Sequence, residues 1–235
     1  MAEQETALIV GAGRGLSASL ARLFAKEGMQ VALAARNTDK LGGLAADIGA
    51  GVHACDAADP ASVDALFAAV TSDIGAPTIV VYNAANRGGR GPVTELDADA
   101  VRNALMISCY GGFLIAQAAA RQMVPAGGGT ILLTGASASV KGYPNSSSFA
   151  MGKFGLRGLA QSLARELQPQ NIHVAHFVID GGIALLDGAD ERAAACGPDG
   201  TLDPDAIAQS YLQIHRQHRS AWTWEIELRP WVEKF

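Results

Sequence analysis

The stretch TALIVGAGRGLSASLARLFAKEG, residues 6–28, joins a short apolar run to a glycine-rich turn and then to an amphipathic helical pattern. In the turn, Gly11 and Gly15 let the backbone approach an anion closely. The helix that begins near Leu16 offers free N–H groups and a partial positive charge to the same anion. This spacing indicates a nucleotide pyrophosphate site. Close packing of the helix on the strand is an alternative use of the glycines, and Ser17 replaces the third glycine of the usual pattern.

Short apolar runs alternate with helix-length segments along the rest of the chain. The runs predicted as strands are 6–10, 29–35, 52–55, 78–83, 130–135, 172–179 and 224–228. They are nearly continuous in hydrophobicity, which is typical of a parallel sheet buried on both faces. With 235 residues, the chain is expected to form one α/β domain, 1–235, with a doubly wound parallel sheet. Segment 180–203 breaks the rhythm and is expected to form a mobile lid or substrate loop.

Glycine and proline mark the helix boundaries. Gly28 is expected to end the first helix, and the pair Asp59-Pro60 to begin another. Pro125 and Pro169 are expected to end the two longest helices, which span 97–122 and 149–168.

The composition narrows the possible partners. The net charge is -5 and the charged fraction is 17%, with no basic stripe that would bind nucleic acid. No window approaches twenty uninterrupted apolar residues, and the opening MAEQET is acidic, so we expect neither a membrane span nor a secretory signal. The expected location is cytoplasmic.

Cysteine and histidine give no metal signature. The cysteines, Cys55, Cys109 and Cys196, lie far apart without a CxxC spacing and are expected to be small core or surface residues. His215 and His218 are interpreted as solvated residues of, or just past, a predicted helix over 204–217. His173 and His176 point to opposite faces of a strand and are interpreted as core or interface residues. No metal is expected.

The end of the second strand indicates the cofactor. A chain that binds NAD usually places an acid there, whereas this one has Ala34, Ala35, Arg36 and Asn37. Arg36, together with Arg14 in the glycine turn, would offer guanidinium groups to a 2′-phosphate. The sequence therefore favours NADP(H) over NAD(H), although two solvated arginines are the alternative interpretation.

Four short motifs resemble those of the short-chain dehydrogenase/reductase family, over essentially the whole chain. They are GAGRGLS (11–17), CDA (55–57), YNAAN (82–86) and FAMGK (149–153), which is similar to the family's YxxxK. The resemblance implies a Rossmann-type sheet of about seven strands and hydride transfer between a nicotinamide cofactor and a carbonyl or alcohol. It implies a cofactor site formed by Gly11, Arg14, Gly15, Leu16, Arg36, Asp56, Asn83, Ala84, Lys153, Gly181 and Ile183.

The same resemblance implies a catalytic set that this chain only partly keeps. Lys153 is retained, but Ser108 stands at the position of the family's Asn, and Phe149 at that of its Tyr. Ala136 stands at the position of the catalytic Ser, with Ser137 one residue away. The family's Pro-Gly after the sixth strand becomes Asp180-Gly181, which would bring a carboxylate toward the nicotinamide pocket.

Phe149 has the aromatic ring of the tyrosine but no proton to give. In carbonyl reduction a tyrosine protonates the new alkoxide, because a nearby ammonium lowers its pKa from about 10. Such an acid contributes about 10² to 10⁴ in rate. Lys153 still shares a helix face with Phe149 and can still bind ribose hydroxyls. The candidates for a replacement donor are Ser137, Ser146, Ser147, Ser148, Tyr143, Tyr82 and a water held by Lys153.

Three functions remain in competition. The first is an NADP(H)-dependent oxidoreductase with a rebuilt proton path, acting on a small or medium-sized apolar carbonyl compound. The second is a catalytically impaired NADP(H)-binding sensor, scaffold or partner subunit. A cofactor-free lyase comes last, because it would need no phosphate cradle. A homodimer or homotetramer is expected through helices 97–122 and 149–168, because GGFLIAQAAA (111–120) would let helices approach closely.

Overall fold

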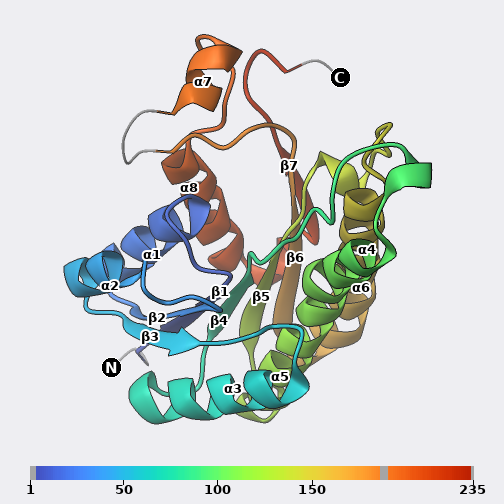
Figure 1. Cartoon of the computed structure of the whole chain (residues 1–235). Coiled ribbons are helices and arrows are strands. Elements are labelled where there is room, and N and C mark those ends of the chain that lie inside the picture. The colour runs from blue at the N-terminus through green and yellow to red at the C-terminus, as the bar shows by residue number, and fades with distance from the viewer. Residues whose placement is uncertain (1–3, 186–189, 234–235) are drawn as a thin grey trace.

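Seven parallel strands form one sheet in the computed structural model, which describes residues 4–185 and 190–233 (Figure 1). The strand order is β3-β2-β1-β4-β5-β6-β7. The strands are β1 Thr6–Val10, β2 Gln30–Ala35, β3 Gly51–Ala54, β4 Ile79–Tyr82, β5 Gly129–Thr134, β6 Ile172–Ile179 and β7 Glu225–Leu228. The predicted doubly wound α/β fold is confirmed, with strand boundaries within a residue or so of those expected.

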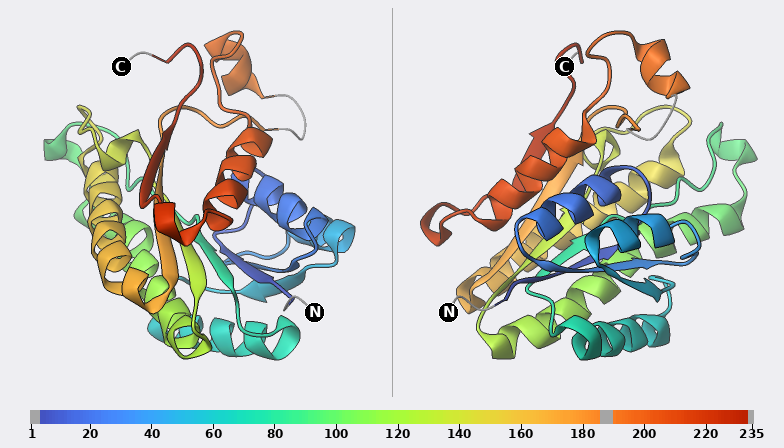
Figure 2. Two further views of the ribbon diagram at one scale, coloured as in Figure 1. Left: turned by 180° about the vertical axis from the view of Figure 1, so that it is seen from behind. Right: turned by 90° about the vertical axis from the view of Figure 1, so that its left-hand side faces the viewer.

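Helices cover both faces of the sheet (Figures 1 and 2). They are α1 Leu16–Lys26, α2 Gly42–Ile48, α3 Pro60–Ile74, α4 Ala98–Leu105, α5 Gly111–Ala126, α6 Ser147–Leu167, α7 Glu191–Cys196 and α8 Pro204–His215. Buried residues of α1, α2 and α8 pack on one face, and those of α3, α5 and α6 on the other. Central strands such as β4 and β6 are buried along their whole length, which explains their unbroken apolar sequence.

Local chemistry sets the helix ends as expected in two cases and differs in a third. The Asp59 side chain accepts hydrogen bonds from the N–H groups of Ala61 and Ser62, and Pro60 takes the first helical position. Gly28 follows α1 with a φ of 88°. Pro125 does not end its helix, because α5 continues to Ala126 with the proline in its last turn.

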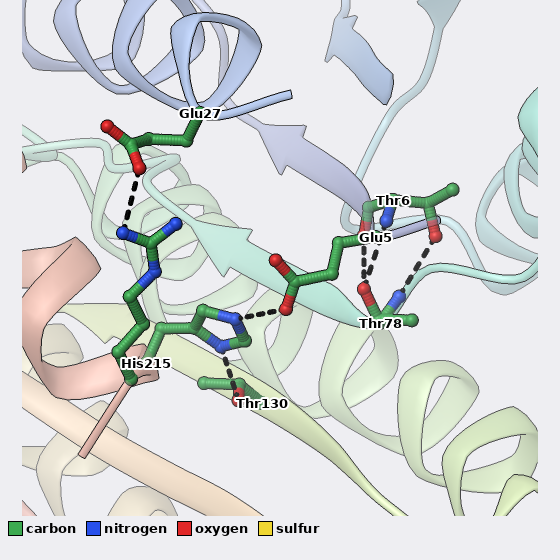
Figure 3. A network of polar contacts seen from close by, with 7 residues as sticks. Glu5, Thr6, Glu27, Thr78, Thr130 and His215 are labelled. Carbon is green, nitrogen blue, oxygen red and sulfur yellow. Dashed lines mark hydrogen bonds and ion pairs between the residues drawn. The ribbon is translucent and has the colours of Figure 1, made fainter. Parts of the chain in front are cut away.

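A network of polar side chains joins the sheet to α8 at the amino ends of the strands (Figure 3). His215 Nε2 lies 2.8 Å from Glu5 Oε1, and His215 Nδ1 lies 2.9 Å from Thr130 Oγ1. The side chain of His215 is only 11% exposed, so its interpretation as a solvated residue was wrong. His218 is exposed, as expected. The last turn of α8 packs on the sheet, so His215 is largely buried there. The sequence of the helix alone does not show this contact.

The helical stretch Ala98–Ala126 is long and apolar enough, by length and composition alone, to cross a membrane. Half of its apolar window is buried inside the fold. Its hydrophobicity is accounted for by packing: Leu114, Ile115 and Ala119 of α5 belong to the core on that face of the sheet.

The C-terminal segment places its three tryptophans differently. Trp222 stacks on His173 with ring centroids 4.6 Å apart, and the Arg157 guanidinium lies over the Trp224 ring at 5.6 Å. Both therefore cover the sheet edge near β7. Trp231 is 85% exposed and covers nothing in the described part of the chain.

Candidate functional site

The glycine turn between β1 and α1 has the backbone that its sequence predicts. Gly11 has a φ of 84°, and a Cβ placed there would lie 2.3 Å from the backbone nitrogen of Ala84. Only glycine fits such a close approach to the end of β4. A Cβ on Gly13 would meet nothing within 4 Å, and one on Gly15 would meet only Leu185, at 3.8 Å. The turn is closed on its inner side and open where α1 begins.

Ser17 explains the missing third glycine. Its hydroxyl donates to the Gly11 carbonyl at 3.1 Å, and Asn83 Nδ2 donates to the same hydroxyl oxygen at 2.7 Å. Ser17 is buried, so these bonds join the turn to the end of β4 in an environment without competing water. In the sequence, this pair is visible only as a polar residue, Ser17, in the apolar first turn of a helix and as Asn83 at the end of a strand.

A cavity of about 590 Å³ opens at the carboxyl ends of β1 to β4, where the strand order reverses. In doubly wound sheets this reversal is where nucleotides bind. The predicted cofactor residues that line it are Gly11, Arg36, Asp56, Asn83 and Ala84, with Ala35, Asn37, Cys55 and Ile107 beside them. Leu16 is 4% exposed and belongs to the core, so only its backbone is available at the start of α1.

The two predicted phosphate-binding arginines do not share that cavity. Arg36 lines the 590 Å³ cavity, whereas Arg14 lines a separate one of about 360 Å³ together with Arg22 and Lys40. All four side chains are exposed. Arg36 is thus the one of the predicted pair that the structure places at the nucleotide cavity. Lys40, four residues beyond Arg36, is a further cation near the turn that no sequence motif marks.

Lys153 is buried beside Phe149 on α6. Its Nζ donates to the Thr134 carbonyl at 2.7 Å and lies 5.9 Å from the centre of the Phe149 ring. Burial lowers the pKa of Lys153 to about 8, and the positive charge of Arg87 acts in the same direction. Lys153 is not among the residues that line the 590 Å³ cavity, so its contact with a cofactor ribose stays a prediction.

Ser108 lies in a π-helical turn, Met106–Tyr110, that separates α4 from α5. Its hydroxyl is buried and lies 3.0 Å from both the backbone nitrogen and the carbonyl oxygen of Asn86. Such turns are frequent at functional sites. Here the turn joins the helix to the loop after β4. The Ser108 hydroxyl makes both of its hydrogen bonds to that loop.

The structure separates the candidate proton donors. The Tyr82 hydroxyl is buried on the Ile107 carbonyl, and burial raises the pKa of Tyr82 far above its usual range. Ser148 is buried and donates to the carbonyl of Arg87 at 2.6 Å. Neither can serve substrate. Ser137 is half-buried and forms no side-chain hydrogen bond with the described residues, while Tyr143 is 45% exposed.

Asp180 does not bring a free carboxylate to the pocket. It is buried, with Oδ2 3.0 Å from Lys141 Nζ and 3.9 Å from an Arg229 nitrogen. Asp180, which replaces the proline of the family's Pro-Gly, therefore joins the loops after β5, β6 and β7 at the carboxyl end of the sheet. Gly181 packs toward Pro230, and Ile183 pairs with Leu202 across the predicted lid. Neither lines the nucleotide cavity, and residues 186–189 of the predicted lid lie outside the described residues.

A buried ionic cluster anchors α6, the helix that carries Phe149 and Lys153. Arg157 donates to both carboxylate oxygens of Glu225 on β7, at 2.6 and 2.8 Å, and His176 Nδ1 lies 3.1 Å from the same carboxylate. Burial lowers the pKa of His176 to about 4, so the ring is neutral near pH 7 and donates to Glu225. The cluster connects α6, β6 and β7 below the site.

These features fit a dinucleotide. Gly11 lets the turn pack closely on the end of β4, the turn is open at Gly13 and Gly15 where α1 begins, and the cavity combines Arg36 with Asp56 and Asn83 at strand ends. No group of His, Cys, Asp and Glu that could hold a metal occurs among the described residues. The fold and the cavity define a dinucleotide-binding protein of the Rossmann class.

The chain belongs to the short-chain dehydrogenase/reductase family. A family model described as enoyl-(acyl carrier protein) reductase matches residues 11–190. A D-threitol dehydrogenase of Mycolicibacterium smegmatis is 33% identical over 72% of this chain and 67% of its own. A human 3-oxoacyl-[acyl-carrier-protein] reductase is 30% identical over 71% of this chain and 70% of its own. These relatives identify the chain as a short-chain oxidoreductase.

Solved structures agree. A short-chain dehydrogenase from Rhodopseudomonas palustris is 35% identical, with a TM-score of 0.83 over 97% of this chain and 100% of its own. A metagenomic short-chain oxidoreductase in complex with NADP is 25% identical, with a TM-score of 0.81 over 96% of this chain and 97% of its own. Two neighbours with a similar fold are bound to NADPH in one case and to NADH in the other.

Proposed function

We propose that the chain is an NADP(H)-dependent oxidoreductase that acts on a carbonyl or alcohol with an atypical proton-donor arrangement. The observation that carries this proposal is the cavity at the ends of β1 to β4, which has Arg36 at its rim and no acid at the end of β2. A guanidinium suits a 2′-phosphate, whereas an acid there would repel it. The NADP complex of the metagenomic relative supports the same cofactor.

The residues of this chain would divide the work around the cofactor. The bound cofactor supplies the hydride. The start of α1 would hold the pyrophosphate, and Asp56 and Asn83 would line the nucleotide. The Phe149 ring would exclude water from one side of the substrate. The substrate oxygen would then take its proton from a water held by the Lys153 ammonium or by the Ser137 hydroxyl.

A catalytically impaired NADP(H)-binding protein is the second candidate. It is favoured by the absence of a hydroxyl on Phe149 and by the engagement of Ser108, Ser148 and Tyr82 with backbone carbonyls. In this case the cofactor would bind without turnover, and the protein would act as a sensor, scaffold or partner subunit.

One assay separates the two candidates: NADPH consumption with a panel of aldehydes and ketones, by the wild type and Phe149→Tyr. If the site has lost its acid, the tyrosine variant gains about 10² to 10⁴ in rate over an inert wild type, because tyrosine supplies the proton. If the wild type is active and the tyrosine adds nothing, another group supplies the proton. Phe154→Tyr, on the exposed side of α6, is the control and should change nothing.

The cofactor preference has its own measurement. Arg36→Ala should weaken NADPH binding by about 10- to 100-fold, the value of a charged hydrogen bond, and leave NADH binding unchanged. Fluorescence titration of both cofactors against the wild type, the variant and an Arg121→Ala control on α5 checks this. Equal affinities of the wild type for the two cofactors would refute the preference.

A further inference from the structure

Arg87 holds its charge over the ring that stands at the reacting position. The guanidinium carbon lies 4.6 Å from the centre of the Phe149 ring, and Lys153 Nζ lies 5.9 Å from the same centre. Both distances are within the range of cation–π attraction. Two positive groups thus flank Phe149, one buried and one at the surface. The proposed function uses Lys153 and leaves Arg87 without a role.

The loop that carries Arg87 is fixed on both sides. Ser148 donates to the Arg87 carbonyl at 2.6 Å, and the Gly88 N–H donates to Asn86 Oδ1 at 3.0 Å. Asn86 is itself bound by its backbone to Ser108. Gly88 has a φ of 64°, and a Cβ there would lie 2.6 Å from Ala104 Cβ, so the loop sits tightly on α4. A ligand that meets Arg87 would not have to order this loop first.

The Arg87 guanidinium has no anionic partner in the described part of the chain. No carboxylate there lies within 4.0 Å of it, and its N–H groups donate to no described atom. Asp180, the carboxylate that follows β6, is engaged with Lys141 and Arg229. Planar guanidinium groups with free donors match a carboxylate in a two-bond arrangement. Arg87 therefore places donors that no described residue uses beside the Phe149 ring.

We propose that Arg87 binds a carboxylate of the substrate, so that the site takes a carbonyl compound with a carboxylate beside the reacting carbon, such as a 2-oxo acid. This inference rests on the proposed function for the position of the reacting carbon. A guanidinium offers hydrogen-bond donors in a fixed planar arrangement, so Arg87 is a binding and orienting group and not the acid. By holding the carboxylate, Arg87 would also orient the substrate, a role that a tyrosine hydroxyl would otherwise share.

Calorimetric binding of oxamate, a redox-inert 2-oxo acid analogue, tests the proposal on the whole protein, with and without NADPH. We expect the wild type to bind oxamate and not its uncharged ethyl ester. Arg87→Ala should lose about 10- to 100-fold in affinity and Arg87→Lys less, because lysine keeps the charge without the planar fork. Arg90→Ala removes an equally charged, exposed residue three positions along the loop and should bind oxamate like the wild type.

Equal binding of oxamate and its ester by the wild type would overturn the proposal, as would an equal loss in the Arg90→Ala control. The failure of the proposed function looks different. If NADPH does not bind, or binds without turnover of any 2-oxo acid, but oxamate affinity still depends on Arg87, the anion site stands and the oxidoreductase activity does not. If neutral aldehydes turn over and no oxamate binds, the activity stands and the anion site does not.

Discussion

Lys153 is a buried ammonium group at the site, and its burial affects the stability of the fold. It is 2% exposed and no described carboxylate pairs with it, so burial of the ammonium is unfavourable wherever the group is charged. Burial lowers the pKa of Lys153 from 10.5 to about 8 in the folded protein. Below about pH 8, both the folded and the unfolded chain hold the proton. Between about pH 8 and 10 the unfolded chain holds more protons, so stability rises with pH through this group.

Lys153→Met should therefore change the pH dependence of folding and not only its level. The free energy of unfolding of the wild type should rise relative to that of the variant by about 1 kcal/mol per pH unit between about pH 8 and 10. Urea unfolding at several pH values measures it. All other side chains are common to both proteins, so their contributions cancel in the difference. If the unfolding free energies of the wild type and Lys153→Met run parallel with pH, the prediction is contradicted. Lys40→Met, at an exposed position, is the control and should run parallel to the wild type.

The residue types of the site could be read from the sequence, but their partners could not. Gly11, Arg36 and Asp56 meet at one cavity because parallel strands deliver their carboxyl ends to one edge. Arg87 was missed because its partner, the Phe149 ring, lies more than sixty residues along the chain, and no local pattern marks a cation–π contact. Asp180 was taken for a free carboxylate because Lys141 and Arg229, which neutralise it, come from two other loops.

At the scale of elements, hydrogen bonds of His215 join α8 to the sheet in addition to apolar packing. The ring links Glu5, just before β1, to Thr130 at the start of β5 (Figure 3). Thr130 is 4% exposed, so its hydroxyl would lose its partner without gaining water if the ring were removed.

His215→Ala should lower the free energy of unfolding by about 2 kcal/mol, the value of two lost bonds of which one leaves a buried group unpaired. His218→Ala, a few residues beyond in an exposed position, should change it by less than about 0.5 kcal/mol. Urea denaturation of the two variants side by side measures the difference. Equal effects would mean that the network in Figure 3 adds no stability beyond ordinary surface contacts.

Elements with strong local signals were predicted well, and those that depend on tertiary packing were not. Strand β6 matches its predicted bounds because an apolar run rich in Ile, Val and Phe, followed by Asp180-Gly181, is typical of a buried strand. The predicted helix over 97–122 is present as the helical stretch Ala98–Ala126, but the π-helical turn between α4 and α5 was not predicted. The Ser108 bonds to Asn86 and the small Gly152 opposite favour the turn there, and both are tertiary contacts.

At the scale of the whole molecule, the face of α5 that was expected to pair subunits is used inside the subunit. Gly111 and Gly112 are buried, and a Cβ on Gly112 would lie 2.5 Å from Leu156 Cδ1 on α6. The small residues allow close approach of two helices of the same chain. The reason given for oligomerisation from sequence was therefore wrong, while the oligomeric state itself stays a prediction.

The outer surface of the same helices offers a better reason to expect a dimer. A groove of about 410 Å³ runs between α5 and α6, lined by Phe113, Val124 and Leu163 among others. Phe113 is 39% exposed, and Phe154 of α6 is 44% exposed. We propose a second copy of the chain as the occupant, because two pairs of α5 and α6 related by a two-fold axis would each cover the apolar residues of the other.

Phe113→Glu should then convert the dimer to a monomer, because a carboxylate in the centre of that interface would be buried without a partner. Light scattering of the wild type should give twice the chain mass of 24.3 kDa, and the variant the mass of one chain. Val93→Glu, at a position 76% exposed and distant in sequence from α5 and α6, should leave the dimer intact. A wild type that runs at 24.3 kDa at all concentrations would remove α5 and α6 as a subunit interface. The carboxyl end of the sheet, with Arg36, Lys153 and Arg87, would then have to work within a single chain.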